Sequence, residues 1–302
     1  PCVSWGERPA ATMPRMSNVE SLIARAEQLL GRLEAVLPHA PEPPDWAASV
    51  AFRARRRHGA LCLEPVRVVS RIRLAELREV DQQKERLLRN TAQFVAGKPA
   101  NNVLLTGAKG TGKSSLIKAV LNEFSGQGLR LIEVDKADLV DLPDLVEQVA
   151  ARPERFVIFC DDLSFDEGEA SYKALKSVLD GSVNAASENV LIYATSNRRH
   201  LLPERMSDNL SGTHAETGEI HPGEAVEEKI SLSERFGLWI SFYPFSQNEY
   251  LAIVAQWLRH FGLSDAAIEA SRQEALVWAL ERGSRSGRVA WQFARDKAGR
   301  DE

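Results

Sequence analysis

The sequence predicts an α/β protein with a doubly wound parallel sheet and a helical lid at the C-terminal end. Between residues 103 and 242, short apolar runs alternate with segments of helical spacing, which is typical of parallel strands buried on both faces. From about residue 246 onward, the apolar spacing is helical only. The α/β core is therefore expected at 76–245 and the helical lid at 246–302.

The elements follow from these spacings. Helices are expected at Asp81–Val95 and Ser114–Phe124 in the core, and at Glu249–Phe261, Asp265–Arg282 and Gly287–Ala298 in the lid. Pro203–Lys229 has no periodicity and is expected to be a long mobile loop. The expected strands are Val103–Leu105, Leu129–Val134, Phe156–Cys160, Val190–Tyr193 and Leu238–Phe242.

Residues 17–75 are expected to form a mainly helical N-terminal region, preceded by a disordered extension at residues 1–16. A second helix is expected at Trp46–Arg57 and a short strand at Leu61–Val69. The region would be a small domain, or an arm that docks on the rest of the chain or on a neighbouring subunit. The first helix, Ser17–Leu37, is predicted by apolar residues at helical spacing, namely Leu22, Ile23, Ala26, Leu29, Leu30, Leu33 and Leu37.

Composition limits the class of protein. The chain has 302 residues, of which 44% are hydrophobic and 26% charged, so it can bury a sizeable core. Its longest apolar runs are far too short to cross a bilayer, and we expect no membrane insertion. Cys2, Cys62 and Cys160 are too widely separated to suggest a disulfide framework or a zinc site. We therefore expect a cytoplasmic protein.

The net charge of −4 conceals an asymmetry. Residues 1–100 carry 16 lysines and arginines against 11 acids, whereas residues 101–302 carry 22 against 31. The basic excess is sharpest at Arg53–Arg57, which could face nucleic acid or an acidic partner, although such a run is more often a solvated surface.

A phosphate-binding loop runs from Gly107 to Ser114. Its sequence, Gly-Ala-Lys-Gly-Thr-Gly-Lys-Ser, fits the G-x-x-x-x-G-K-[ST] pattern and lies between an expected strand and an expected helix. Glycines allow successive backbone N–H groups to face phosphate oxygens, and the helix N-terminus favours anions. Lys113 would reach the β- and γ-phosphates, and the Ser114 hydroxyl would bind Mg²⁺. The sequence therefore predicts a nucleotide-binding site.

Polar residues at the ends of later strands extend this site. Asp161 and Asp162 follow the strand ending at Cys160, where Asp161 would help to hold Mg²⁺ and Asp162 would polarise an attacking water. Asn197 ends the next strand and could hold that water. Arg235 precedes the strand at 238, and Arg288 opens the last helix, from which it could reach the phosphates.

Taken together, these motifs resemble the AAA+ superfamily of P-loop ATPases. The segments around Asn102–Ser115, Cys160–Phe165, Ala194–Leu201 and Ser286–Phe293 resemble more narrowly a bacterial AAA+-like family of unknown function, over roughly Ile72 to the C-terminus. The resemblance implies an oligomeric ATPase that uses ATP and Mg²⁺ and acts on an unknown macromolecule.

It further implies roles for individual residues. Asp162, Asn197 and Arg235 would be catalytic, with Arg235 acting as the arginine finger in competition with Arg198, Arg199 and Arg205. One departure is that Asp162 stands where the superfamily usually has glutamate, which leaves slow hydrolysis open. Ser114 and Asp161 would bind the metal, and the nucleotide would be held by Gly107, Ala108, Lys109, Gly110, Thr111, Gly112, Lys113, Ser114, Ser115 and Arg288.

Other functions remain open. One alternative is a weakly hydrolysing, nucleotide-dependent switch or loader that binds nucleic acid or a protein through the basic N-terminal region. A GTPase is disfavoured, because Val134–Asp138 only faintly resembles a guanine-reading motif and precedes the acidic pair. A small-molecule kinase would not need Asn197 and Arg235 in this order.

Overall fold

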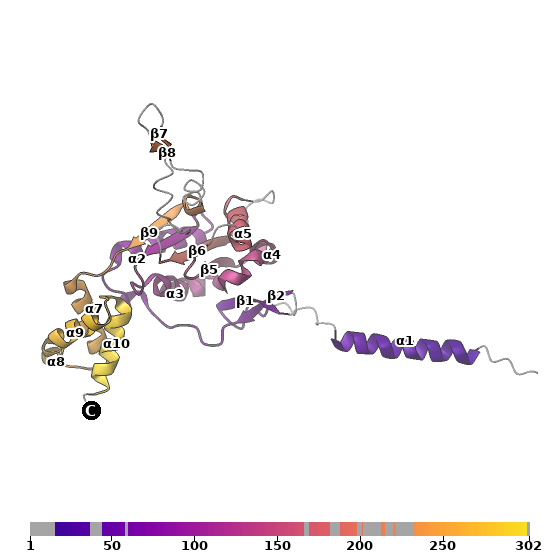
Figure 1. Ribbon diagram of the computed structural model, residues 1–302, viewed down its shortest axis with the longest axis horizontal. Helices are drawn as coiled ribbons and strands as arrows, with labels where there is room; N and C mark the ends of the chain where they lie inside the picture. The colour runs from indigo at the N-terminus through magenta and orange to yellow at the C-terminus, as the bar shows by residue number, and fades with distance from the viewer. Residues whose placement is uncertain are drawn as a thin grey trace, which may run out of the picture. The chain divides into compact units, whose positions relative to one another are not determined.

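The computed structural model describes residues 16–36, 44–57, 60–165, 169–181, 188–197, 201, 213–214, 220–221 and 232–300 (Figure 1). The chain divides into two compact units, one of residues 1–42 and 58–60 and the other of residues 43–57 and 61–302. Residues 1–15 of the expected N-terminal extension lie outside the described residues, and Met16 is the first residue of a helix. The expected loop at 203–229 also lies outside the described residues, apart from the short pair β7 (Thr213–His214) and β8 (Ile220–His221).

The larger unit contains a seven-stranded sheet in the order β2-β1-β4-β5-β6-β3-β9. The pairs β1–β4, β4–β5, β5–β6, β6–β3 and β3–β9 are all parallel, which confirms the predicted parallel sheet. The strands are β1 (Ala51–Arg57), β2 (Ala60–Pro65), β3 (Val103–Gly107), β4 (Leu129–Val134), β5 (Arg155–Cys160), β6 (Val190–Ser196) and β9 (Leu238–Phe242).

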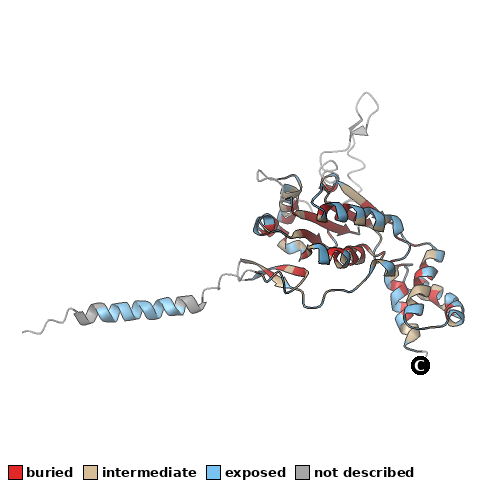
Figure 2. Cartoon of the chain, turned by 180° about the vertical axis from the view of Figure 1, so that it is seen from behind, coloured by how far each residue is buried: buried red, intermediate tan, exposed pale blue. Residues whose placement is uncertain are grey.

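Helices cover both faces of this sheet. Val103 and Leu105 of β3 pack in one apolar cluster with α2 (Asp81–Val95) and α3 (Lys113–Phe124). Leu104, between them, packs in a second cluster with α4 (Leu142–Ala150) and α5 (Ala170–Leu179). Figure 2 shows the strands as a buried layer between helices with exposed outer sides. Short 3-10 helices occur at Leu74–Glu76, Ser125–Gln127 and Lys136–Asp141.

After the last strand of the sheet, the described chain forms only helices, as predicted. Ser246 caps the first of them with a hydroxyl that accepts from the Glu249 N–H, and Ser286 caps the last in the same way from Val289. The single helix expected at 265–282 is two helices that meet at Ser271. The lid helices are α7 (Gln247–His260), α8 (Asp265–Ala270), α9 (Arg272–Glu281) and α10 (Gly287–Ala298).

The helix predicted at Trp46–Arg57 is wrong, because residues 51–57 form β1. Ala51 packs in the first apolar cluster, whereas Phe52 and Ala54 pack in the second, so successive side chains point to opposite faces. Pairing with β4, from Ala51 opposite Leu131 to Ala54 opposite Val134, overrides the local preference. The strand predicted at 61–69 is confirmed only as far as Pro65, and residues 51–65 belong to the sheet rather than to a helical region.

The smaller unit contains α1 (Met16–Val36), which confirms the predicted first helix. The side chains of residues 20–32 are all exposed, and Leu22 has a relative exposure of 70%. In the described part of the chain, no helix is both long enough and apolar enough to cross a membrane.

Candidate functional site

The candidate site lies where the carboxyl ends of three neighbouring strands meet. Strands β5, β6 and β3 are adjacent and parallel, so the residues that follow them gather at one edge of the sheet. The phosphate-binding loop follows β3, Asp161 and Asp162 follow β5, and Asn197 follows β6. The topology therefore unites motifs that are up to 90 residues apart in the sequence.

Glycine backbone conformations shape the phosphate-binding loop. Gly107, Gly110 and Gly112 have φ angles of 124°, 78° and 102°, a region that other residues rarely adopt. At Gly107 an added Cβ would lie 1.8 Å from the carbonyl oxygen of Phe242, so only glycine fits against β9. These glycines curve the loop ahead of α3, whose N-terminus lies at Lys113.

The Lys113 side chain spans the loop and reaches β6. Its ammonium donates to the carbonyl oxygens of Gly107 and Ala108, both at 2.8 Å, and to Oδ1 of Asn197 at 2.9 Å. Burial lowers the pKa of Lys113 below the ordinary 10.5, although the negative charges of Asp162 and Asp161 act in the opposite direction and raise it. A buried, partly desolvated cation of this kind favours an anionic ligand such as a polyphosphate.

Ser114 and Asp161 form an oxygen-rich pair beside this cation. The Ser114 hydroxyl donates to Asp161 Oδ1 at 2.6 Å, and the buried Thr195 hydroxyl donates to the same oxygen at 2.6 Å. Hydroxyl and carboxylate oxygens are the donors that Mg²⁺ prefers in proteins, where it also keeps waters and binds phosphates. The two predicted metal residues are thus adjacent, and their chemistry fits Mg²⁺.

Asp162 and Asn197 form the second polar pair. Asn197 donates through Nδ2 to Asp162 Oδ1. Asp162 has a φ of 53°, a left-handed conformation that is uncommon outside glycine and occurs more often at functional sites. Its N–H donates to Thr195 Oγ1 at 2.8 Å, and the next N–H, of Leu163, donates to the Thr195 carbonyl at 2.7 Å. The turn after β5 is therefore fixed to β6.

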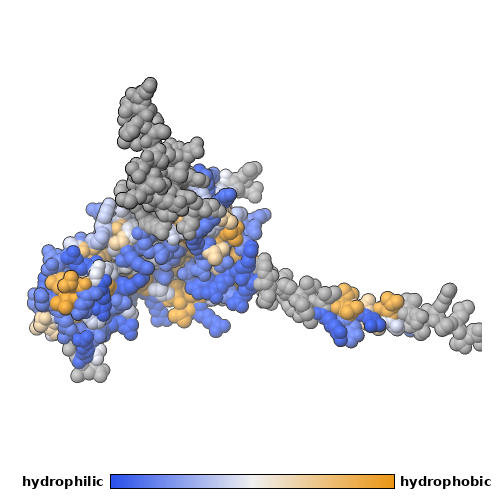
Figure 3. Space-filling model, viewed as in Figure 1, coloured by the Kyte–Doolittle hydropathy of each residue, from blue (hydrophilic) through white to orange (hydrophobic). Residues whose placement is uncertain are grey.

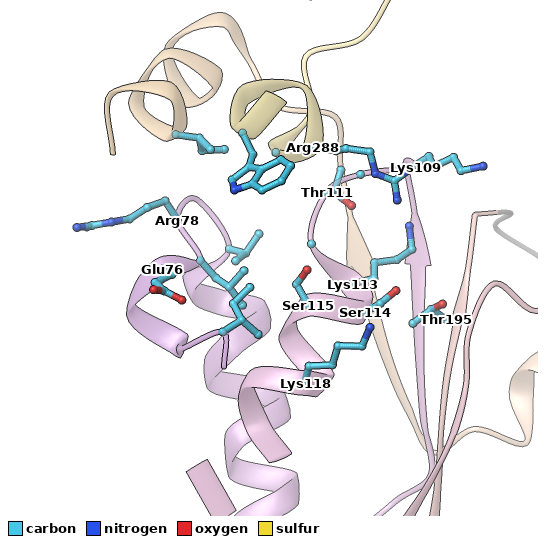
Figure 4. A pocket seen from close by; sticks show the side chains of 18 of the residues that line it. Glu76, Arg78, Lys109, Thr111, Lys113, Ser114, Ser115, Lys118, Thr195 and Arg288 are labelled. Carbon is cyan, nitrogen blue, oxygen red and sulfur yellow. The ribbon is translucent and has the colours of Figure 1, made fainter. Parts of the chain in front are cut away.

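The lid closes one side of the site. The N–H of Arg288 donates to the Gly110 carbonyl at 3.4 Å, and an added Cβ on Gly110 would lie 2.9 Å from Ser286 Oγ. Between lid and core lies a cavity of about 540 Å³, a size typical of small-molecule sites. Figure 4 shows Arg288 on the lid side of this cavity and Lys113 and Ser114 on the core side.

Most predicted binding residues line this cavity, including Lys109 to Ser115, Asp161, Asp162, Asn197 and Arg288. Gly107 and Ala108 do not line it and instead accept the hydrogen bonds from Lys113. Sequence reasoning missed the apolar wall, because no motif marks it and it forms only when the segment before α2 meets the lid. This wall consists of Ile72, Leu77, Val80, Phe245, Ile253, Trp257 and Trp291.

Two hydrogen bonds hold that segment to the lid. Gln256 of α7 donates to the Glu76 carbonyl at 2.9 Å, and Arg78 donates to Gln256 Oε1 at 3.0 Å. The segment before α2 and the lid are therefore joined by polar contacts as well as by packing.

Arg235 lies apart from the cavity. It pairs with Asp180, which directly follows α5. It does not line the cavity that holds the other predicted residues. The competing arginines Arg198, Arg199 and Arg205 lie outside the described residues.

Carboxylates neutralise much of the basic run at 53–57. Arg53 pairs with Glu133 at 2.7 Å, and Arg56 and Arg57 pair with Asp141 and Glu64. The pKa of Arg53 is raised by its hydrogen bond with Glu133. The run is therefore a set of ion-paired side chains on β1, which lies between β2 and β4, and these contacts give a nucleic-acid role no support.

Comparisons with known proteins give the family. A family model described as "Protein of unknown function (DUF815)" matches residues 47–301. None of the curated proteins compared with the chain matches it. Among solved structures, RuvB of Thermotoga maritima is 16% identical, with a TM-score of 0.48 over 75% of this chain, and the chain spans 64% of that RuvB chain. A chain of the E. coli MS115-1 HORMA:CdnC:Trip13 complex is 14% identical, with a TM-score of 0.47 over 74% of this chain and 90% of that one.

The arrangement of strands, motifs and lid confirms the predicted fold. A parallel sheet carries the phosphate-binding loop, the acidic pair and the terminal asparagine on adjacent strands, and helices alone follow it. The chain therefore has an α/β core that carries a P-loop motif, followed by a C-terminal helical lid.

Proposed function

The chain belongs to the DUF815 family of proteins of unknown function, and we propose that it is an ATPase that hydrolyses ATP to ADP and phosphate. The observation that carries the proposal is the convergence of Lys113, Ser114, Asp161, Asp162 and Asn197 at one edge of the sheet, beside a cavity of about 540 Å³. This set supplies a cation for phosphates, oxygen ligands for a metal and a base for water.

Phosphate binding would depend on the loop and on Lys113. Backbone N–H groups of the loop and the N-terminus of α3 provide donors and a favourable field for anions. The Lys113 ammonium exchanges its present carbonyl acceptors for β- and γ-phosphate oxygens, which compensates for the burial of its charge. Arg288 would add a second cation from the lid.

Ser114 and Asp161 would hold Mg²⁺ together with the phosphates. When bound, the ion neutralises charge on the β- and γ-phosphates. Thr195 holds the Asp161 carboxylate in place through its hydrogen bond, so the orientation of the metal ligand is set by β6.

Asp162 and Asn197 would activate the attacking water. The Asp162 carboxylate accepts a proton from the water as the water oxygen bonds to the γ-phosphorus, and the bond to the ADP oxygen breaks. Asn197 bridges Lys113 and Asp162, so the residue that orients the water also contacts the phosphate-binding cation. Products are ADP and inorganic phosphate.

The apolar wall of the cavity would take the base. Leu77, Val80, Trp257 and Trp291 offer aliphatic and aromatic surface to a flat ring, and the sequence has no guanine-reading motif at the expected place. We therefore assign ATP rather than GTP as the nucleotide.

Assembly would complete the site. Arg235 lies outside the cavity of its own chain, as expected of an arginine that serves a neighbouring subunit, and an arginine supplied in this way is worth about 10³- to 10⁵-fold in turnover. The chain would then act as an oligomer on a macromolecule, and the residues of the nucleotide site do not indicate which macromolecule this is.

ATP binding is tested with the 302-residue chain. Isothermal titration with ATP and Mg²⁺ should give saturable binding that Lys113→Ala reduces by about 100-fold or more, because a buried charge-assisted contact is lost. Lys173→Ala, on the exposed side of α5, is the matched control and should bind as the wild type does. Equal binding by both variants would remove the site from consideration.

A further inference from the structure

Helix α1 carries an exposed apolar stripe that no described residue of its own unit covers. Leu22, Ile23, Leu29 and Leu30 have relative exposures of 70%, 53%, 55% and 58%. Figure 3 shows hydrophobic side chains along one side of this helix and hydrophilic ones along the other. In proteins, most of the stability of a helix comes from the packing of its apolar face rather than from the intrinsic preferences of its residues.

The stripe follows a seven-residue repeat. Leu22 and Leu29 are seven residues apart, Ala26 lies between them at a spacing of four and three, and Ile23 and Leu30 widen the stripe on one side. This spacing is the coiled-coil pattern, in which apolar positions recur every three or four residues and face another helix.

Charged residues border the stripe, with one sign on each side. On a helical wheel, Arg25 and Arg32 flank it on one side and Glu20 and Glu27 on the other. All four side chains are exposed. The sequence of α1 holds three glutamates against two arginines, so this helix lacks the basic face that would draw it to an anionic lipid surface.

The borders also select the partner and its direction. Around a rotation axis parallel to the helices, the arginine border of each copy faces the glutamate border of the next, whereas an antiparallel pair would place arginine against arginine. We propose that α1 self-associates with α1 of further copies of this chain in a parallel helical bundle. The inference does not depend on the ATPase proposal, because α1 contributes no residue to the nucleotide site.

The test measures the mass of the nucleotide-free, 302-residue chain by light scattering and sedimentation over a range of concentrations. The wild type should form a species of two or more chains. Leu22→Glu with Leu29→Glu should raise the dissociation constant about 100-fold or more, because two charges replace buried apolar side chains. The control variant, Ser21→Glu with Gln28→Glu, adds the same charges at the same spacing but outside the apolar stripe. It should change the dissociation constant less than about threefold.

Several results would overturn the proposal. These are a monomeric wild type at all concentrations, equal association of the two double variants, or a monomer whose stability falls in the stripe variant, which would place α1 on its own chain. ATP affinity is measured on the same samples. Lost association with unchanged ATP affinity supports the bundle and leaves the nucleotide site intact, which separates this proposal from the previous one.

The parallel direction has its own test. Arg25→Glu with Arg32→Glu should weaken association about tenfold, since both borders become acidic, and adding Glu20→Arg with Glu27→Arg should restore it by exchanging the borders. A parallel bundle would be contradicted if the variant with all four substitutions does not regain association. It would also be contradicted if the double arginine variant associates as the wild type does.

Discussion

The Lys113 ammonium and the Asn197 amide oxygen lie 2.9 Å apart, and the same Asn197 side chain donates through Nδ2 to Asp162. The residue at the end of β6 thus connects the cation of the phosphate-binding loop with the acid that follows β5. Through this contact, the position of the Lys113 ammonium can affect the position of the proposed base.

Loss of the Asn197 amide should affect turnover more than binding. Asn197→Ala is expected to lower kcat about 10²- to 10³-fold, because removal of one polar group that acts on the reacting atoms typically has an effect of this size. ATP affinity should change less than about tenfold. Phosphate release and titration calorimetry measure the two quantities. Asn248→Ala, an exposed asparagine on the lid, serves as the control, and a change confined to affinity would contradict the assigned role.

Arg235 should act on a neighbouring subunit. Arg235→Ala is expected to abolish ATP hydrolysis and retain ATP affinity. Mixing it with Asp162→Asn, itself inactive, should restore part of the activity, because the mixture contains sites with an intact Asp162 beside a chain with an intact Arg235. Asp180→Asn removes the Arg235–Asp180 ion pair within one chain and tests whether that pair affects stability without affecting ATP hydrolysis. No recovery on mixing would remove Arg235 from the neighbouring site.

ATP affinity should decrease with rising pH before an ordinary lysine titrates. Burial lowers the pKa of Lys113 below 10.5, so its ammonium loses its proton, and its attraction for phosphate, at a lower pH. The same shift makes the ligand-free fold more stable as the pH rises through that lowered pKa, since the unfolded chain then holds the extra proton. Calorimetry across the alkaline range should show a steep fall for the wild type and a flatter one for Lys113→Arg. Identical profiles would contradict the assignment.

The phosphate-binding loop should not tolerate a side chain at Gly107. An added Cβ would lie 1.8 Å from the Phe242 carbonyl oxygen at a φ of 124°, so Gly107→Ala should cost more than about 3 kcal/mol in the free energy of unfolding. Gly126→Ala, where nothing lies within 4 Å, should change it by less than about 1 kcal/mol. Denaturant unfolding of the two variants gives the comparison. Similar unfolding midpoints would show that the loop accommodates a side chain at Gly107 and would contradict this prediction.

The placement of these polar residues at the strand ends was predictable from sequence, because each motif is local. The glycine spacing of 107–112 and the acids after a five-residue apolar run are visible without the fold. Strand adjacency then brings them together, as parallel strands require.

The rest depends on tertiary contacts. The apolar wall joins Leu77 and Val80 to Trp257 and Trp291 from a lid more than 150 residues away, and no local pattern indicates such a meeting. Strand β1 resembled a helix because Ala51, Phe52 and Ala54 are buried on both faces and so lack the alternation of a half-exposed strand.

The most direct test of the ATPase proposal compares phosphate release from ATP by the wild-type chain and by Asp162→Asn, with Mg²⁺ and at protein concentrations that permit assembly. The variant keeps the shape of the side chain and removes its charge. We expect steady, Mg²⁺-dependent release by the wild type and a loss of about 10²- to 10⁴-fold in the variant, with ATP binding retained by both. Equal rates in the two proteins, or no release by a wild type that is saturated with ATP, would contradict the proposal.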